Sequence, residues 1–142
     1  MSEAGRQLCL WGIGLIGVGL LNGFVVPLVA APRIGLSAHL AAVQGGMLLA
    51  LLGLVWPSLA LRGAAEVAAR NLAIGSLWSI WLGIALGAAF GAARAFPIAG
   101  AGVASSASRW QEGLSAALVV GGSLASLAAI GLVLLGLWRS AR

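Results

Sequence analysis

The residue best suited to chemistry is His39, the only histidine in the chain. An imidazole can ligate a metal or a haem iron through one ring nitrogen while a neighbouring group fixes the other nitrogen. Iron needs only one protein ligand when a porphyrin fills its equatorial plane, so a lone histidine is sufficient for that role. The alternative is that His39 simply lies in the interfacial layer of a membrane, beside Ser37 as an N-cap. The residue types alone leave both interpretations open.

Small residues follow His39 at helical spacing. Val43, Gly46, Ala50 and Gly53 share a helix face with it, at steps of three, four and seven residues. A stripe of small side chains below a histidine would leave room for a flat ligand. We therefore expect Gly46 to contribute to a cofactor-binding surface.

Two amide side chains fall inside apolar segments and are further candidates for a catalytic role. They are Asn22 and Gln44. An amide without a hydrogen-bond partner is costly in a bilayer, so each needs one. That partner is either another helix or a ligand in a cavity. For Ser76 and Ser79 we expect hydroxyls that bond back to helix carbonyls.

Charged side chains near the segment ends provide the remaining candidates. Arg33 and Arg94 could hold anionic groups such as haem propionates, and lipid phosphates explain them equally well. Glu112 is expected near the start of a helix, where the positive end of the helix dipole stabilises a carboxylate.

The composition excludes most other chemistry. Hydrophobic residues make up 61% of the 142 residues, charged residues only 8%, and the mean hydropathy is +1.09, which indicates an integral membrane protein. One histidine, one cysteine and three acidic residues cannot form a Ser-His-Asp triad or a multi-ligand zinc site. The net charge of +5 comes from arginines in the termini and connections, which is typical of membrane topology and not of nucleic-acid binding.

Four apolar stretches must position these candidates, at about residues 8–30, 39–61, 71–92 and 114–138. Each is long enough, at about 1.5 Å per residue, to cross a hydrocarbon core of about 30 Å. We therefore predict an all-α, single-domain bundle of four transmembrane helices over residues 1–142. Glycines four residues apart, at Gly19 and Gly23 and again at Gly83, Gly87 and Gly91, predict close helix packing, more within the chain than between copies.

The arginines also predict an orientation. Five lie in the termini and the second connection, against three in the first and third connections. This bias favours a cell (inner) membrane protein with both termini in the cytoplasm. Trp11, Trp56, Trp110 and Trp138 are expected at headgroup level, near the helix ends.

Two sequence blocks resemble the hydroxylaminobenzene mutase family. The first comprises residues 24–28 (FVVPL) and 31–40 (APRIGLSAHL), and the second comprises residues 97–102 (PIAGAG) and 110–112 (WQE). By architecture this family is similar to the styrene oxide isomerases, which are small four-helix membrane proteins. The resemblance implies a haem b protein that is a homo-oligomer in the lipid bilayer, a trimer, with His39 as the axial iron ligand. It also implies that the iron acts as a Lewis acid on an epoxide or hydroxylamine oxygen of a small aromatic substrate, without net redox change.

The chain departs from the family pattern at two places. Family members tend to have Asn-Gly six and seven residues after the histidine, where this chain has Gly45 and Gly46. Gln44 lies about 100° around the helix from Gly45, which leaves open whether it replaces the missing amide. Relatives also use tyrosine and asparagine from the third helix, whereas this chain has no tyrosine and offers Ser76, Trp78, Ser79 and Trp81 there.

The leading hypothesis is a membrane-embedded, haem b-dependent isomerase that rearranges an arylhydroxylamine or an aryl epoxide. The alternative is a non-enzymatic membrane protein that binds haem or a partner subunit through its glycine-rich helix faces. A channel or transporter is disfavoured, because no segment has a polar stripe long enough to line a path.

Overall fold

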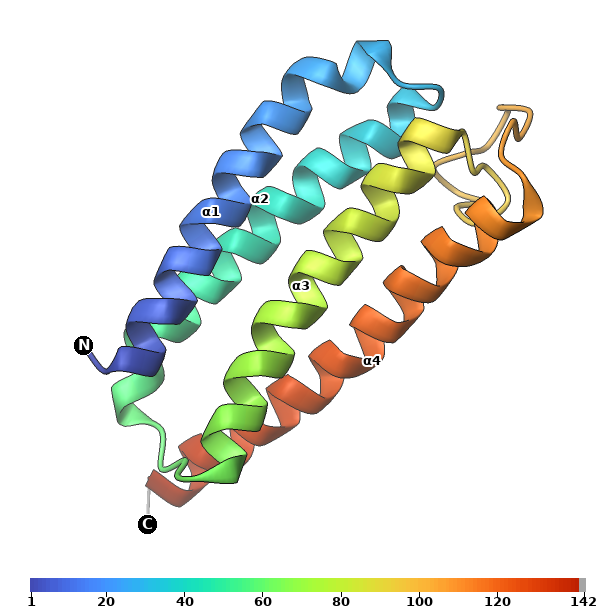
Figure 1. Cartoon of the computed structure of the whole chain (residues 1–142). Coiled ribbons are helices and arrows are strands. Elements are labelled where there is room, and N and C mark those ends of the chain that lie inside the picture. The colour runs from blue at the N-terminus through green and yellow to red at the C-terminus, as the bar shows by residue number, and fades with distance from the viewer. Residues whose placement is uncertain (141–142) are drawn as a thin grey trace.

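The computed structural model describes residues 1–140 and contains four long helices (Figure 1). They are α1 (Glu3–Val25), α2 (Pro32–Val55), α3 (Ala64–Phe90) and α4 (Arg109–Ser140). All four are long and apolar enough to cross a membrane. The predicted all-α fold with four membrane-spanning helices is therefore confirmed, and the chain is a multi-pass membrane protein.

Every helix begins earlier than the apolar stretches predicted. Polar first turns explain the difference, because they are helical but do not raise the hydropathy. Ser2 caps α1 by accepting a hydrogen bond from the Gly5 backbone N–H at 3.1 Å. Pro32 occupies the first turn of α2, where its missing N–H costs nothing.

Prolines also end the first two helices. Pro27 lies in a short 3₁₀ turn, η1 (Val26–Leu28), and Pro57 lies in another, η2 (Trp56–Ser58). Proline cannot donate the backbone hydrogen bond that would continue the α-helix. The predicted ends at residues 30 and 61 are therefore too late for α1 and α2.

The four helices pack as two antiparallel pairs. α1 lies along α2 and α3 lies along α4, while α2 also contacts α3 and α1 touches α3 only lightly. The α1–α2 and α3–α4 connections lie at one end of the bundle, and the start of α1, the end of α4 and the α2–α3 connection lie at the other (Figure 1). We call these the connection end and the terminal end.

Glycines allow α1 and α2 to approach closely. A Cβ atom added at Gly12 would lie 2.6 Å from the carbonyl oxygen of Gly46, and one at Gly5 would lie 2.6 Å from that of Gly53. In the other pair, a Cβ at Gly83 would lie 2.8 Å from a methyl group of Val119 on α4. The predicted close packing through small residues is therefore present inside the chain.

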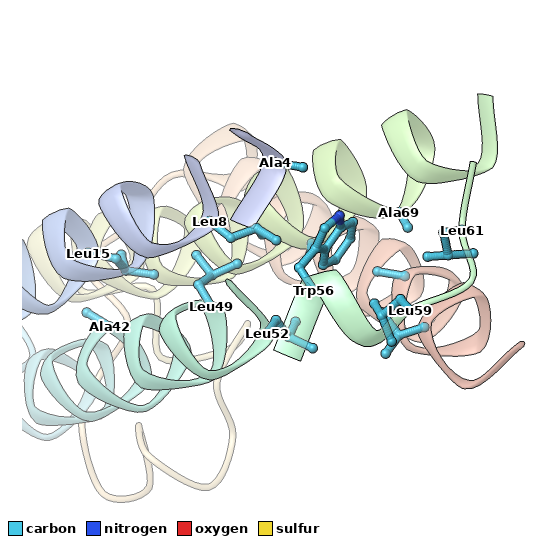
Figure 2. Close-up of a cluster of buried hydrophobic side chains, with 13 residues drawn as sticks. Ala4, Leu8, Leu15, Ala42, Leu49, Leu52, Trp56, Leu59, Leu61 and Ala69 are labelled. Carbon is cyan, nitrogen blue, oxygen red and sulfur yellow. The ribbon is translucent and has the colours of Figure 1, made fainter. Parts of the chain in front are cut away.

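The main core lies between α1, α2, the start of α3 and the second half of α4, and it extends toward the terminal end (Figure 2). Leu8 and Leu15 of α1 meet Leu49 of α2, and all three are fully buried. Trp56 fills the space near the α2–α3 connection, and its indole N–H donates to Glu66 at 3.3 Å. A smaller cluster around Ile34 and Ala88 joins α2 to α3 at the connection end. These two clusters fix α2 against both of its neighbours.

Candidate functional site

His39 projects from the second turn of α2 toward α1. Its Nδ1 atom lies 2.7 Å from the backbone carbonyl oxygen of Gly19. A carbonyl oxygen only accepts hydrogen bonds, so Nδ1 carries a proton and donates it. In the neutral ring, Nε2 is then the nitrogen with a free lone pair.

The Nε2 atom is available to a ligand. The side chain is half-buried, and within residues 1–140 this nitrogen has no hydrogen-bond partner. Nε2 is also not one of the fully buried polar atoms that lack a hydrogen-bond partner in this range. An imidazole held through one nitrogen and open at the other has the arrangement of a single-histidine metal ligand.

The small-residue face below His39 is occupied by α1, which corrects the expectation of an open slot. A Cβ at Gly46 would lie 2.5 Å from the Gly12 carbonyl oxygen and 2.6 Å from the Ile16 side chain. Gly53 packs against Gly5 in the same way. Gly46 is therefore a helix contact in this structure. Small residues suit a flat ligand and a close helix equally well, so the spacing alone could not distinguish them.

The two candidate amides lie on different surfaces. Asn22 is half-buried on α1 and follows Leu8 and Leu15 at steps of seven residues, so it continues a stripe whose other members are fully buried. Gln44 is exposed on α2 and lies about 140° around the helix from His39. Neither amide has a hydrogen bond in the described part of the chain. Within one chain, the structure does not bring Gln44 to His39.

The two candidate arginines lie at the connection end. One guanidinium nitrogen of Arg33 donates to the Ala101 carbonyl at 3.3 Å, and the rest of the side chain is exposed. The Arg94 side chain is exposed, while its backbone N–H donates to Glu112 at 3.3 Å. Arg33 precedes His39 by six residues, which is about 9 Å along the helix.

Glu112 holds the long α3–α4 connection together. Its carboxylate accepts hydrogen bonds from the backbone N–H groups of Arg94 and Ala95, at 3.3 and 2.7 Å, and from the Ser105 hydroxyl. It lies in the first turn of α4, as expected. The sequence analysis missed its role as a crosslink, because its partners are backbone groups that only the folded connection brings near.

The hydroxyls of α3 behave in two ways. Ser76 donates back to the Ala73 carbonyl at 3.1 Å, as expected. Ser79 instead donates across the interface to the Leu118 carbonyl of α4, at 2.9 Å. The prediction of a bond within its own helix was therefore wrong for Ser79.

Three tryptophans form a cluster that the sequence analysis missed. Trp11 of α1 and Trp78 of α3 meet edge to face, with ring centroids 5.7 Å apart, and Trp78 meets Trp81 in the same way. Trp11 lies eight residues inside α1, so it does not mark the end of that helix. The indole nitrogens of Trp78 and Trp81 are buried without a hydrogen-bond partner in the described residues.

The described residues contain no group of three or more His, Cys, Asp or Glu side chains that could hold a bare metal ion. Any metal at His39 would therefore need most of its ligands from elsewhere, as iron in a porphyrin does.

Comparison with known proteins supplies the family. A family model for styrene oxide isomerase matches residues 4–138. The chain belongs to this family. It is also 44% identical over 137 residues to hydroxylaminobenzene mutase HabB from Ectopseudomonas oleovorans, an alignment that covers 96% of this chain and 82% of HabB.

A second relative is hydroxylaminobenzene mutase HabA from the same organism, 40% identical over 89 residues, or 62% of this chain and 66% of HabA. No solved structure matches the chain. The resemblance to the hydroxylaminobenzene mutases is therefore confirmed, and the chain is a membrane protein of a family of intramolecular isomerases.

Proposed function

We propose that this protein is a haem b-dependent isomerase that rearranges an arylhydroxylamine or an aryl epoxide inside the membrane. The similarity to HabB over nearly the whole chain supports the reaction class. The observation that carries the cofactor assignment is the geometry of His39, whose Nδ1 is engaged by Gly19 and whose Nε2 has no hydrogen-bond partner among the described residues.

The surroundings of His39 suit it as a haem ligand but limit where the porphyrin could lie. The free Nε2 suits an axial ligand. The face formed by Gly46 and Gly53, however, is filled by α1, so it is not available to the porphyrin. We infer that His39 holds the cofactor at the outer surface of the α1–α2 pair. The exposed apolar side chains there are Leu20 and Phe24 on α1, and Leu36 and Leu40 on α2.

When bound, the haem would supply a Lewis-acidic iron that polarises the C–O or N–O bond of the substrate. His39 would hold the cofactor in a fixed orientation. The apolar helix surfaces would take up an aromatic substrate from the bilayer and keep water away from developing positive charge. Arg33 and Arg94 at the connection end would pair with anionic groups, either haem propionates or lipid phosphates.

An amide is proposed to orient the substrate oxygen, and Asn22 has more support than Gln44. Asn22 is half-buried, unpaired within the described residues, and in the same turn of α1 as Gly19 and Gly23. Gln44 faces outward, so its participation would require a second copy of the chain. We propose a homo-oligomer because the resemblance to the family implies one; the apolar surfaces that the four helices leave exposed can contact lipid or another copy.

The glycine faces only partly weaken the non-enzymatic alternative. Glycines at the helix interfaces, such as Gly12, Gly46 and Gly83, are in contact with helices of the same chain, but Gly17 and Gly121 have nothing within 4 Å and are free to bind a partner subunit. Family membership favours an isomerase over a packing protein.

The visible absorption spectrum of the detergent-purified, haem-supplied protein tests the proposal. We expect a Soret band in the wild type, its loss in His39→Ala, and conversion of an arylhydroxylamine or aryl epoxide by the wild type alone. A haem-replete wild type without a Soret band would exclude the iron mechanism. A Soret band without any rearrangement activity would favour the non-enzymatic alternative.

A further inference from the structure

The imidazole of His39 is seated against α1 at two glycines one turn apart, Gly19 and Gly23. A Cβ atom added at Gly23 would lie 3.0 Å from Nδ1 of His39, 3.3 Å from Cε1 and 3.8 Å from Cγ. These are the three nearest atoms to that position, so the missing side chain at Gly23 makes room for the imidazole ring.

The Gly19 carbonyl has the capacity for this extra bond. In the helical pattern it already accepts the backbone N–H of Gly23, four residues later. A carbonyl oxygen has two lone pairs, and the second is directed at the Nδ1–H of His39, 2.7 Å away. The nitrogen that donates this bond is also the atom nearest to the position of a Gly23 Cβ, at 3.0 Å. A side chain at Gly23 would therefore force the ring to shift beside its acceptor.

We propose that Gly23 is a positioning residue for His39: by leaving room for the imidazole beside the Gly19 carbonyl, it fixes the Nδ1–H tautomer and presents the Nε2 lone pair to a ligand. This inference rests on the proposed function, because the ligand presented to Nε2 is the proposed haem iron. A hydrogen bond from the other ring nitrogen to a carbonyl orients a ligating histidine and raises its basicity. The interaction joins residues 20 positions apart, on two different helices.

A matched pair of substitutions isolates the effect. Gly23→Ala adds a methyl group against the imidazole. Gly17→Ala adds the same group to the same helix, at a position with nothing within 4 Å. Both changes raise the helix propensity of α1 alike, so a difference between them reports the contact with His39.

The tautomer can be read directly, because the chain has one histidine. We would label histidine with nitrogen-15, reconstitute the haem-free protein in lipid, and record its nitrogen spectrum under mildly alkaline conditions, which keep an imidazole neutral. The wild type and Gly17→Ala should show a single form protonated at Nδ1. Gly23→Ala should show a mixture with the Nε2–H form.

A wild type protonated at Nε2 would overturn the inference even if Gly23→Ala failed to fold. An unchanged tautomer in a folded Gly23→Ala would overturn it too. These outcomes do not depend on haem. The Soret band of the wild type separately decides the proposed function, so the two can fail independently.

The loaded protein gives a second measurement. The iron–histidine stretching frequency of the ferrous form should shift in Gly23→Ala and stay unchanged in Gly17→Ala. Haem affinity should fall by about 10- to 100-fold in Gly23→Ala, the loss typical of removing a group that orients a metal ligand. Equal frequencies and affinities in the two variants would contradict a positioning role for Gly23.

Discussion

Gly46 of α2 lies directly against Gly12 of α1, so that a Cβ on either residue would come within 2.6 Å of the other's carbonyl oxygen. The neighbouring Gly45 is different, because a Cβ there would make ordinary contacts with Leu15 and Leu77, at 3.5 and 3.6 Å. The α1–α2 interface therefore depends on one of two adjacent glycines, although both are buried.

This difference predicts that Gly46→Ala destabilises the protein and Gly45→Ala does not. Forcing a methyl group against backbone atoms should cost about 1–3 kcal/mol, as in other overpacked cores. The measurement is thermal unfolding in detergent, followed by circular dichroism. Because the two substitutions are identical and adjacent, equal unfolding temperatures would contradict the interface described here.

The sequence predicted the number and class of the helices well, because long apolar runs have few alternatives to a membrane helix. It did not predict where the helices begin, because the first turns contain residues that lie outside the apolar runs. Pro32 in the first turn of α2 and Glu112 in the first turn of α4 are examples. It identified His39 by its chemistry but not its bond to Gly19. That bond depends on the relative register of α1 and α2, which no local pattern encodes.

The interpretation of Gly46 shows a second limit. Its spacing from His39 correctly placed both residues on one side of α2. Whether that side would face a ligand or another helix depended on Gly12 and Gly5, which are 34 or more positions away in the sequence. Composition alone does not select between these partners.

The hydrogen bonds of Glu112 predict that Glu112→Gln loosens the α3–α4 connection. An amide cannot accept as strongly as a carboxylate from the backbone N–H groups of Arg94 and Ala95, and hydrogen bonds to charged groups contribute about 1.5–3 kcal/mol. Amide hydrogen exchange at residues 94 and 95 should become about 10-fold faster or more. Arg109→Gln is the matched control, since Arg109 is exposed in the same first turn. Unchanged exchange in Glu112→Gln would show that the carboxylate does not secure the connection.

The proposed role of Asn22 predicts a selective loss of turnover. Asn22→Leu should lower kcat by about a hundredfold, the loss typical of removing one donor that acts on developing charge. The Soret band should be unchanged, because His39 is untouched. Gln44→Leu, on the exposed side of α2, is the comparison. If Gln44→Leu lowers kcat while Asn22→Leu does not, the orienting amide is Gln44 and it acts across a subunit contact.

The positions of the arginines predict which end of the bundle faces the cytoplasm. Four arginines lie at the terminal end, namely Arg6, Arg62, Arg70 and Arg139, and positive residues are retained on the cytoplasmic side. We therefore expect the terminal end to face the cytoplasm.

Single cysteines in a Cys9→Ser background can report the orientation. One replaces Ile98, which is 86% exposed at the connection end, and the other replaces Arg62, which is exposed at the terminal end. In right-side-out membrane vesicles, a membrane-impermeant maleimide should label the cysteine of Ile98→Cys and spare that of Arg62→Cys. Inverted vesicles should give the opposite pattern, and detergent should expose both. Labelling of Arg62→Cys alone in right-side-out vesicles would reverse the proposed orientation and place the connection end, with Arg33 and Arg94, in the cytoplasm.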